Sequence, residues 1–276
     1  MATAFARRYG YSVRFTCNSN IKMAQKLNLP NGEYLEYHHF PGELPGIVFL
    51  PGLMSSMSGT KAMALEKYCL STGRAYTRFN HRGMGLSSGK AHEFTIGSRK
   101  EDVLNILDAI KGPQILVGSS LGGWIMLLVA MEMPHKIPGL IGIATALNFV
   151  KRRFDSLPDE TKTIIKSTGR WEMPTPYNEK PYILSWDMIQ EAKQHELNKN
   201  IAVNCPVRLI HGMNDKEVPY DISIDLANNL QSNDVQVTLI KNGTHRLSGP
   251  KDIQTITRTI KLLVQDINAK DMASNL

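Results

Sequence analysis

Short apolar segments alternate with amphipathic segments along most of the chain. The patterns predict strands at residues 34–40, 46–50, 75–79, 115–117, 137–145, 206–210 and 235–240, and helices at residues 60–70, 96–110, 124–133, 219–230 and 252–267. Several of these strands are continuously apolar, which is typical of a parallel sheet that is buried on both faces. Because strands alternate with helices, we expect an α/β fold with a mostly parallel central sheet flanked by helices, and with residues 34–40 at the sheet edge.

The alternation stops between residues 146 and 200. This segment combines prolines with large aromatic residues, namely Pro158, Pro174, Pro176 and Pro181 with Trp171, Tyr177, Tyr182 and Trp186. A long insertion into a regular α/β chain commonly folds as a lid or cap over the functional site. We therefore expect a helical cap at about 146–200, whose aromatic residues and methionines would give a pocket an apolar roof. The alternative is a helical excursion without a functional role.

Length and composition are those of a globular protein. The chain has 276 residues, enough for one large domain or two small ones. No apolar run reaches the ~18 to 20 residues of a membrane-spanning helix, so we expect no transmembrane segment. The three cysteines, Cys17, Cys69 and Cys205, are odd in number and widely spaced, which favours neither a disulfide framework nor a zinc site. The glycine-rich segment 80–89 lacks the glycine spacing of a dinucleotide-binding motif.

The positive charge is concentrated at the start of the chain. Five of the 32 basic residues lie within residues 1–32, which contain no acidic residue, and the other basic residues nearly balance the 25 acidic ones. Because no dense basic patch remains, we expect no nucleic-acid partner. An acid-free leader that contains arginine is typical of a mitochondrial transit peptide. We expect such a leader at 1–32 of a mitochondrial protein and a folded domain at 33–276; a basic tail on a cytoplasmic protein is the alternative.

The segment 115–124 carries the first candidate for chemistry. A predicted strand runs into Gly118, Ser120 and Gly122 of a Gly-x-Ser-x-Gly motif, and a long apolar segment follows. Strand, sharp turn and helix are the context of a nucleophile elbow, in which a serine takes a strained, positive-φ backbone between small neighbours. The Ser120 hydroxyl would then lie at a helix N-terminus, which favours developing negative charge. Most chance matches to so short a motif are ordinary turns, and the absence of a Gly-Lys-Ser/Thr ending disfavours a phosphate-binding loop.

Two later loops supply an acid and a base. Asp215 and His245 each follow a predicted strand. Ser120, Asp215 and His245 therefore occur in the chain order of an α/β-hydrolase triad, each just past the carboxyl end of its own strand. Taken singly, the acid could be a turn or helix cap and the histidine a surface residue. We expect His211, at the start of the Asp215 loop, to pack or cap rather than to catalyse.

The three residues predict acyl transfer to serine. A serine hydroxyl is a weak nucleophile, so His245 would accept its proton and later protonate the leaving group, while Asp215 would orient the imidazole and stabilise its cation. The oxyanion would need two backbone N–H donors. We expect these to be Leu121, directly after the nucleophile, and Leu53, in the loop after the strand at 46–50.

Several stretches of the sequence resemble one family. They are residues 114–124, Gly59-Thr60-Lys61-Ala62, Val203-Asn204-Cys205-Pro206 with His211-Gly212-Met213, and Thr244-His245-Arg246. Together they resemble the mitochondrial α/β-hydrolase domain-containing protein 10 family, and the similarity extends from about Pro45 to the C-terminal helix, including the cap. The sequence departs from the wider pattern at Asn80, where many relatives outside this family carry Asp, and in the residues that flank His245.

The resemblance implies an α/β-hydrolase fold with a helical cap inserted after the sixth strand, and no cofactor or metal. It also implies a mitochondrial serine hydrolase with Ser120, Asp215 and His245 as its triad. The family is described as a palmitoyl-protein thioesterase, acting on S-acylated (palmitoylated) proteins, and as an esterase of small acyl glucuronides such as that of mycophenolic acid. The alternatives are a general carboxylesterase for small molecules and a non-catalytic ligand-binding protein on the same fold.

Overall fold

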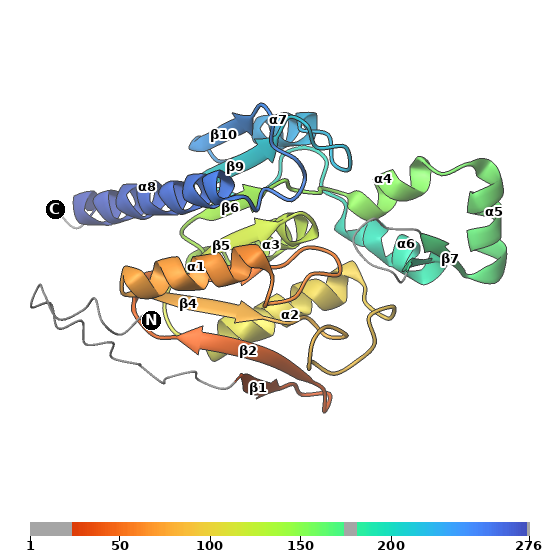
Figure 1. Cartoon of the computed structure of the whole chain (residues 1–276), viewed down its shortest axis with the longest axis horizontal. Coiled ribbons are helices and arrows are strands. Elements are labelled where there is room, and N and C mark those ends of the chain that lie inside the picture. Colours follow the sequence, from red (N-terminus) through yellow and green to blue (C-terminus); the bar gives the residue numbers. More distant parts are fainter. Residues whose placement is uncertain (1–23, 174–180, 275–276) are drawn as a thin grey trace, which may run out of the picture.

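The centre of the computed structural model, which describes residues 24–173 and 181–274, is an eight-stranded sheet (Figure 1). Its strand order is β1-β2-β4-β3-β5-β6-β9-β10. The strands are β1 (Gln25–Asn28), β2 (Tyr34–Phe40), β3 (Glu43–Leu50), β4 (Arg74–Phe79), β5 (Gln114–Ser119), β6 (Leu140–Ile143), β9 (Val207–Gly212) and β10 (Val235–Ile240). The β1–β2 and β2–β4 pairings are antiparallel and the others are parallel. The predicted α/β fold with a mostly parallel sheet is confirmed.

Helices cover both faces of this sheet. They are α1 (Thr60–Ser71), α2 (Ile96–Ala109), α3 (Leu121–Glu132), α7 (Asp221–Asn229) and α8 (Pro250–Ser274). Alternate residues of the central strand β5 belong to two cores. Leu116 packs in the core that contains α2 and α3, whereas Ile115 and Val117 pack in the core that contains α1 and α8. All three side chains are fully buried, which explains why this strand has no polar alternation.

The segment between β6 and β9 extends beyond one end of the sheet (Figure 1). It contains α4 (Phe149–Asp155), α5 (Asp159–Thr168), β7 (Arg170–Met173), β8 (Tyr182–Ser185), α6 (Trp186–Ala192) and the 3-10 helix η2 (Lys193–His195). The proline and aromatic pattern predicted a purely helical insertion. The insertion differs from this prediction, because β7 and β8 form an antiparallel pair. Pro174, Pro176 and Tyr177, on which that prediction also drew, lie outside the described residues.

Several predicted boundaries are wrong. The sheet edge is β1, not β2, and β1 lies within residues 1–32, so the fold begins before the predicted domain start at residue 33. Residues 1–23 of the predicted leader lie outside the described residues. Strand β6 begins only at Leu140, because the 3-10 helix η1 (Pro134–Lys136) and Pro138 precede it. Strand β9 extends to Gly212, so His211 belongs to the strand and not to the loop.

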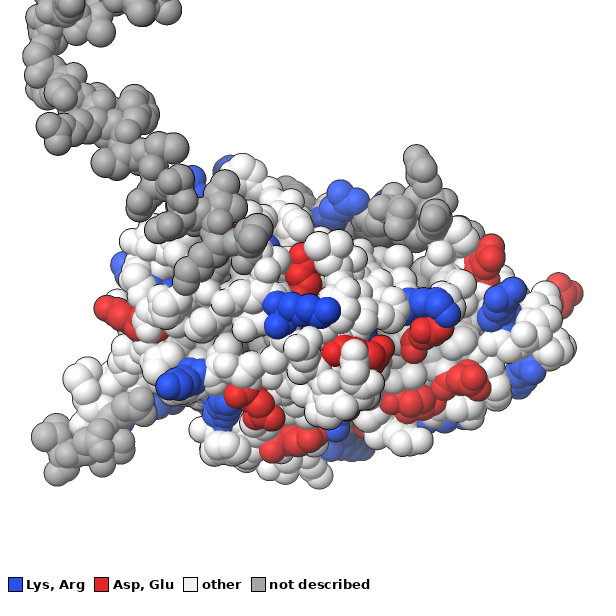
Figure 2. All heavy atoms as spheres, turned by 90° about the horizontal axis from the view of Figure 1, so that it is seen from below, with Lys and Arg blue, Asp and Glu red and all other residues white. Residues whose placement is uncertain are grey.

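The surface carries charges of both signs. On the face in Figure 2, Lys and Arg side chains are interspersed with Asp and Glu side chains. Ion pairs among the described residues include Arg208 with Asp234 at 2.7 Å and Lys100 with Glu132 at 2.6 Å. None of the described helices combines the length and the apolar composition that crossing a membrane requires.

Candidate active site

Ser120 occupies a sharp turn between β5 and α3. Its backbone has φ 53° and ψ −118°, a strained conformation for a residue with a side chain. The two glycines of the motif permit it, because a Cβ at Gly118 would lie 2.4 Å from the carbonyl oxygen of Gly122, and a Cβ at Gly122 would lie 2.3 Å from that of Leu50. The sequence Gly-x-Ser-x-Gly is thus required by the close approach of α3 to β3 and β5.

The structure brings the three predicted side chains together from the loops after β5, β9 and β10. His245 Nε2 lies 3.0 Å from Ser120 Oγ, and His245 Nδ1 lies 2.7 Å from Asp215 Oδ2. Because an ionised carboxylate only accepts hydrogen bonds, Nδ1 is the donor toward Asp215. In the neutral ring Nε2 then carries no proton and accepts the hydrogen bond of the Ser120 hydroxyl. This is the tautomer that a general base toward Ser120 requires.

The carboxylate of Asp215 is fully buried and has four donors. The backbone amides of Glu217 and Val218 each donate to Oδ1 at 2.9 Å, and His245 and His211 lie within hydrogen-bond distance of Oδ2. Burial opposes ionisation, but the hydrogen bonds from the two histidines and from the Val218 amide outweigh it and hold the pKa of Asp215 well below its usual range. Asp215 is therefore an ionised acceptor.

His211 is a contact of this acid that the sequence did not reveal. Its ring is completely buried in β9. Nε2 lies 3.0 Å from the Val218 carbonyl oxygen and 3.2 Å from Asp215 Oδ2, and Nδ1 lies 2.7 Å from Ser223 Oγ. Since carbonyl and carboxylate oxygens only accept, Nε2 carries a proton, and Nδ1 can accept the Ser223 hydroxyl in a neutral ring. His211 packs, as expected, but it also holds the acid; its position four residues before Asp215 at a strand end was the available signal.

The loop after β3 approaches the nucleophile closely. A Cβ at Gly52 would lie 3.2 Å from Ser120 Cβ, so only glycine permits this approach without displacement. Leu53 and Leu121, the predicted oxyanion donors, both line the pocket that contains Ser120. Within the described residues, neither backbone N–H has an acceptor. Met54, which follows in the loop, has a left-handed backbone with φ 53°.

Asn80 holds the other end of this loop. Its Oδ1 accepts from the Met57 amide at 2.8 Å, and its Nδ2 donates to Glu36 Oε2 at 2.6 Å. An aspartate at this position would place a second carboxylate against Glu36 and would lack the donor. Asn80, at which this sequence departs from the wider pattern, therefore suits its neighbour Glu36.

The pocket at Ser120 has a volume of about 540 Å³ and is lined by both the main domain and the insertion. The insertion contributes Phe149, Arg153, Met173 and Tyr182. The expected apolar roof is therefore present in part, but Trp171 and Trp186 do not line it. Its charged lining residues are mostly basic: Lys61, Arg153, Lys216 and Arg246, with Glu217 as the acid.

Lys61 connects this pocket to the loop of the base. Its Nζ donates to the carbonyl oxygen of Arg246, the residue after His245. Burial lowers the pKa of Lys61 to about 8, partly opposed by Asp252. No group of His, Cys, Asp and Glu side chains within residues 24–173 and 181–274 has the arrangement of a metal site.

The insertion is anchored to the main domain by Glu191. Its carboxylate accepts from the backbone amides of Ile96 at 2.9 Å and Gly97 at 2.8 Å, which are free N–H groups at the start of α2. Trp124 Nε1, from α3, donates to the His195 carbonyl oxygen at 3.1 Å. These contacts hold the insertion against the two helices that pack beside the nucleophile strand.

Comparisons with known proteins identify the family. A model described as the alpha/beta hydrolase fold matches residues 45–173, and a model described as the prolyl oligopeptidase family matches residues 113–265. The chain is 44% identical over 253 residues to the palmitoyl-protein thioesterase ABHD10, mitochondrial, of Bos taurus, covering 91% of this chain and 82% of that protein. This chain belongs to the ABHD10 family of α/β hydrolases. The resemblance drawn from the sequence is confirmed.

Solved structures agree with this assignment. Alpha/beta hydrolase domain-containing protein 10 from mouse matches with a TM-score of 0.84 and 43% identity, covering 88% of this chain and 99% of that one. A putative hydrolase from Agrobacterium vitis S4 matches with a TM-score of 0.82 and 30% identity, covering 87% and 97%. The chain is therefore a hydrolase, and the mitochondrial localisation predicted from the sequence is confirmed by its membership of the ABHD10 family.

Proposed function

We propose that this member of the ABHD10 family cleaves acyl thioesters and esters through an acyl-enzyme on Ser120. The observation that carries the proposal is the continuous chain of hydrogen bonds from Ser120 Oγ through His245 to the ionised Asp215. As Oγ attacks the acyl carbonyl carbon, His245 Nε2 accepts its proton. The resulting imidazolium is stabilised by Asp215 and protonates the leaving thiolate or alkoxide. Water, deprotonated in turn by His245, then releases the carboxylic acid and restores Ser120.

The oxyanion of each tetrahedral intermediate would be bound by backbone N–H groups. Leu121 is favoured because its amide lies at the start of α3, where the helix dipole favours negative charge. Leu53 is favoured because its loop is in contact with the nucleophile through Gly52. Both amides lack an acceptor among the described residues, which leaves them available to a substrate oxygen.

We infer that S-acylated proteins are one substrate class, as the name palmitoyl-protein thioesterase of the curated relatives suggests. Phe149, Met173 and Leu53 supply apolar surface beside the nucleophile, which suits an acyl chain. We propose that the insertion at about 146–200 acts as a cap over this site, because its residues from α4, β7 and β8 line the pocket.

Small acyl glucuronides are the second proposed class, because the pocket offers cations to an anionic leaving group. Arg153 Nε donates to Met173 Sδ at 2.8 Å, and within the described residues its terminal nitrogens have no hydrogen-bond or ion-pair partner. A guanidinium binds a carboxylate with paired N–H donors. Arg153 would therefore bind the carboxylate of the sugar, whereas a neutral thioester would not use it.

A matched substrate series tests the proposal. The measurement is kcat/KM on palmitoyl and shorter thioesters, the corresponding oxygen esters and one acyl glucuronide, with Ser120→Ala as the blank. We expect Ser120→Ala and His245→Ala each to lose on the order of 10³-fold or more. Preference for short or bulky oxygen esters would favour a general carboxylesterase, and no turnover of any substrate would favour a non-catalytic ligand-binding protein.

Arg153→Gln, compared with Arg152→Gln, isolates the glucuronide part of the proposal. The two arginines are adjacent on α4, but only Arg153 lines the pocket at Ser120. Arg153→Gln should lower kcat/KM for the acyl glucuronide by about tenfold and leave kcat/KM for the neutral thioester unchanged. An equal loss on both substrates would contradict recognition of the carboxylate.

A further inference from the structure

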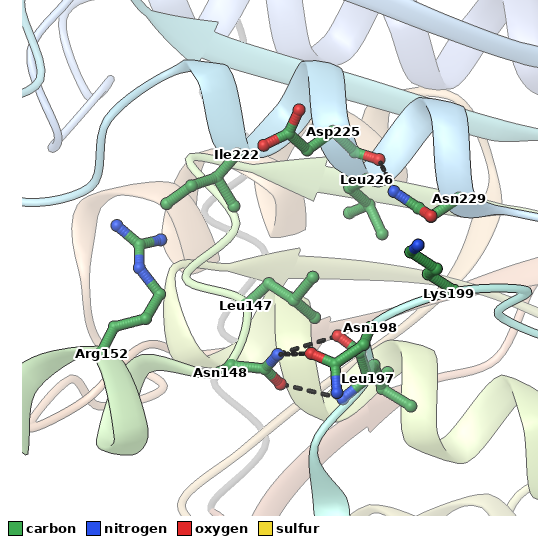
Figure 3. Close-up of a pocket in the computed structure, with 10 residues that line it drawn as sticks. All are labelled: Leu147, Asn148, Arg152, Leu197, Asn198, Lys199, Ile222, Asp225, Leu226 and Asn229. Carbon is green, nitrogen blue, oxygen red and sulfur yellow. Dashed lines mark hydrogen bonds between the residues drawn. The ribbon is translucent and has the colours of Figure 1, made fainter. Parts of the chain in front are cut away.

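A second cavity, of about 470 Å³, lies at the base of the insertion (Figure 3). Its walls come from the two chain segments that join the insertion to the main domain, residues 147–152 and 197–199, and from α7. It shares no lining residue with the pocket at Ser120. Its volume is within the ~300 to 1,000 Å³ of small-molecule sites.

Asn148 fixes one wall of this cavity. Its Nδ2 donates to the Leu197 carbonyl oxygen at 2.8 Å, and its Oδ1 accepts from the Leu197 amide at 3.0 Å, so the side chain pairs with the opposite segment as a peptide group would (Figure 3). The Asn148 backbone is left-handed, with φ 52° and ψ 33°, a conformation that asparagine tolerates better than most residues. The two connecting segments are thereby held together, and the cavity is preformed.

Arg152 faces this cavity with an uncompensated charge. The side chain is half-buried, and burial lowers the pKa of its guanidinium. Within residues 24–173 and 181–274 it has neither an ion pair nor a side-chain hydrogen bond. Asp225 lines the same cavity from α7, but Figure 3 shows its carboxylate apart from the guanidinium, and the two form no ion pair. A guanidinium that is partly removed from water and has no partner costs free energy that an anionic ligand would recover.

The remaining lining is divided between apolar and basic groups. Leu147, Ile222 and Leu226 supply apolar surface, and Lys199 adds a second cation that has no ion pair among the described residues. A planar carboxylate matches the paired donors of one guanidinium, and an attached hydrocarbon would contact the leucine and isoleucine side chains. Phosphate offers no apolar portion for that surface, and a neutral hydrocarbon would leave Arg152 unpaired.

We propose that this cavity binds a monocarboxylate with a short apolar tail, its carboxylate paired with Arg152 and its tail against Leu147, Ile222 and Leu226. The ligand bridges α4 of the insertion to α7 of the main domain. The proposed binding site does not depend on the reaction at Ser120. Only one consequence rests on the proposed function: carboxylic acids are the products of that reaction, so the product class would also bind at the base of the insertion.

Calorimetric titration of the full chain with octanoate tests the site. Ser120 is first blocked with a fluorophosphonate, so that the catalytic pocket is occupied. We expect one octanoate to bind the blocked protein, with affinity lowered about tenfold or more in Arg152→Gln and unchanged in Arg153→Gln. Octan-1-ol, which lacks the charge, should not give saturable binding.

The outcomes separate this inference from the proposed function. Absence of octanoate binding to the blocked protein, or equal affinity in Arg152→Gln, overturns the carboxylate site. Failure of the fluorophosphonate to label Ser120 contradicts the proposed function instead, and the titration then proceeds on the unblocked chain with the same two variants. If Arg152→Gln does not fold, Ile222→Trp decides, because the larger indole would cover the apolar surface proposed for the tail. Unchanged octanoate affinity in that variant overturns the proposal.

Discussion

His211 gives the most informative perturbation, because it contacts the acid without contacting the base or the nucleophile. His211→Phe removes the donor Nε2, which lies 3.2 Å from Asp215 Oδ2 and 3.0 Å from the Val218 carbonyl oxygen. It also removes Nδ1, which lies 2.7 Å from the buried Ser223 hydroxyl oxygen. A hydrogen bond to a charged group contributes about 1.5–3 kcal/mol, and an unsatisfied buried polar group costs about 1–3 kcal/mol. Because these contributions overlap, we expect the free energy of unfolding to fall by about 2–4 kcal/mol.

The effect on catalysis should be much smaller than the loss of the acid itself. In His211→Phe, Asp215 keeps the two backbone amides and His245 Nδ1 as donors, so it remains ionised and still orients the base. We expect kcat/KM to fall by about tenfold or less, compared with about 10⁴-fold for the carboxylate-to-amide change in a serine triad. His211→Gln, which can keep one donor toward Asp215, should recover part of both losses.

Urea unfolding and steady-state kinetics on the same preparations provide the assay. The midpoint should shift at constant m-value, which would indicate a change in stability and not in the denatured state. Ser223→Ala is the matched control, since it removes only the partner of Nδ1 and should cost about 0.5–1.5 kcal/mol. Stability unchanged in His211→Phe, or a kinetic loss as large as that of Asp215→Asn, would refute the assignment of His211 as a positioning residue.

Other predictions follow from single contacts. Gly122→Ala should destabilise the fold and abolish turnover, because its Cβ would lie 2.3 Å from the Leu50 carbonyl oxygen; a soluble, active variant would contradict the tight turn. The pKa of Lys61 is lowered to about 8, so between pH 8 and the usual lysine range the folded state binds fewer protons than the unfolded state. Stability should therefore rise between pH 8 and the usual lysine range, and Lys61→Met should remove this rise in pH-dependent denaturation. The pKa of Asp215 is held low, so its ionisation stabilises the fold at pH values above the usual aspartate range, and this stabilisation is lost on acidification. Acid denaturation of Asp215→Asn should lack this loss.

The elements around Ser120 could be predicted because their signals are local. Gly118, Ser120 and Gly122 are neighbours in the sequence, and the backbone turn that they permit depends on atoms within a few residues and on the adjacent strand. The order of Asp215 and His245 after later strands was sufficient to anticipate that they meet, because parallel strands present their carboxyl ends at one edge of the sheet.

The features that the sequence did not reveal depend on contacts between distant segments. The edge strand β1 has a polar, exposed pattern, since one of its sides faces solvent, and it therefore resembled a leader. Strands β7 and β8 have four residues each, and they are recognisable as strands only by the hydrogen bonds between them. The cavity at Arg152 is formed by α4, residues 197–199 and α7, which no periodicity brings together. Burial of His211 is likewise visible only after α7 packs against β9.

The acyl-enzyme mechanism is tested most directly by locating the acyl group during turnover. The purified chain would be mixed with a palmitoyl thioester, quenched in acid within one turnover and digested, and the acylated peptide identified by mass spectrometry. We expect a palmitoyl ester on Ser120 that is absent in Ser120→Ala and does not form at a comparable rate in His245→Ala. Turnover of the thioester without any acyl group on Ser120, or with the acyl group on another residue, would contradict the acyl-enzyme mechanism.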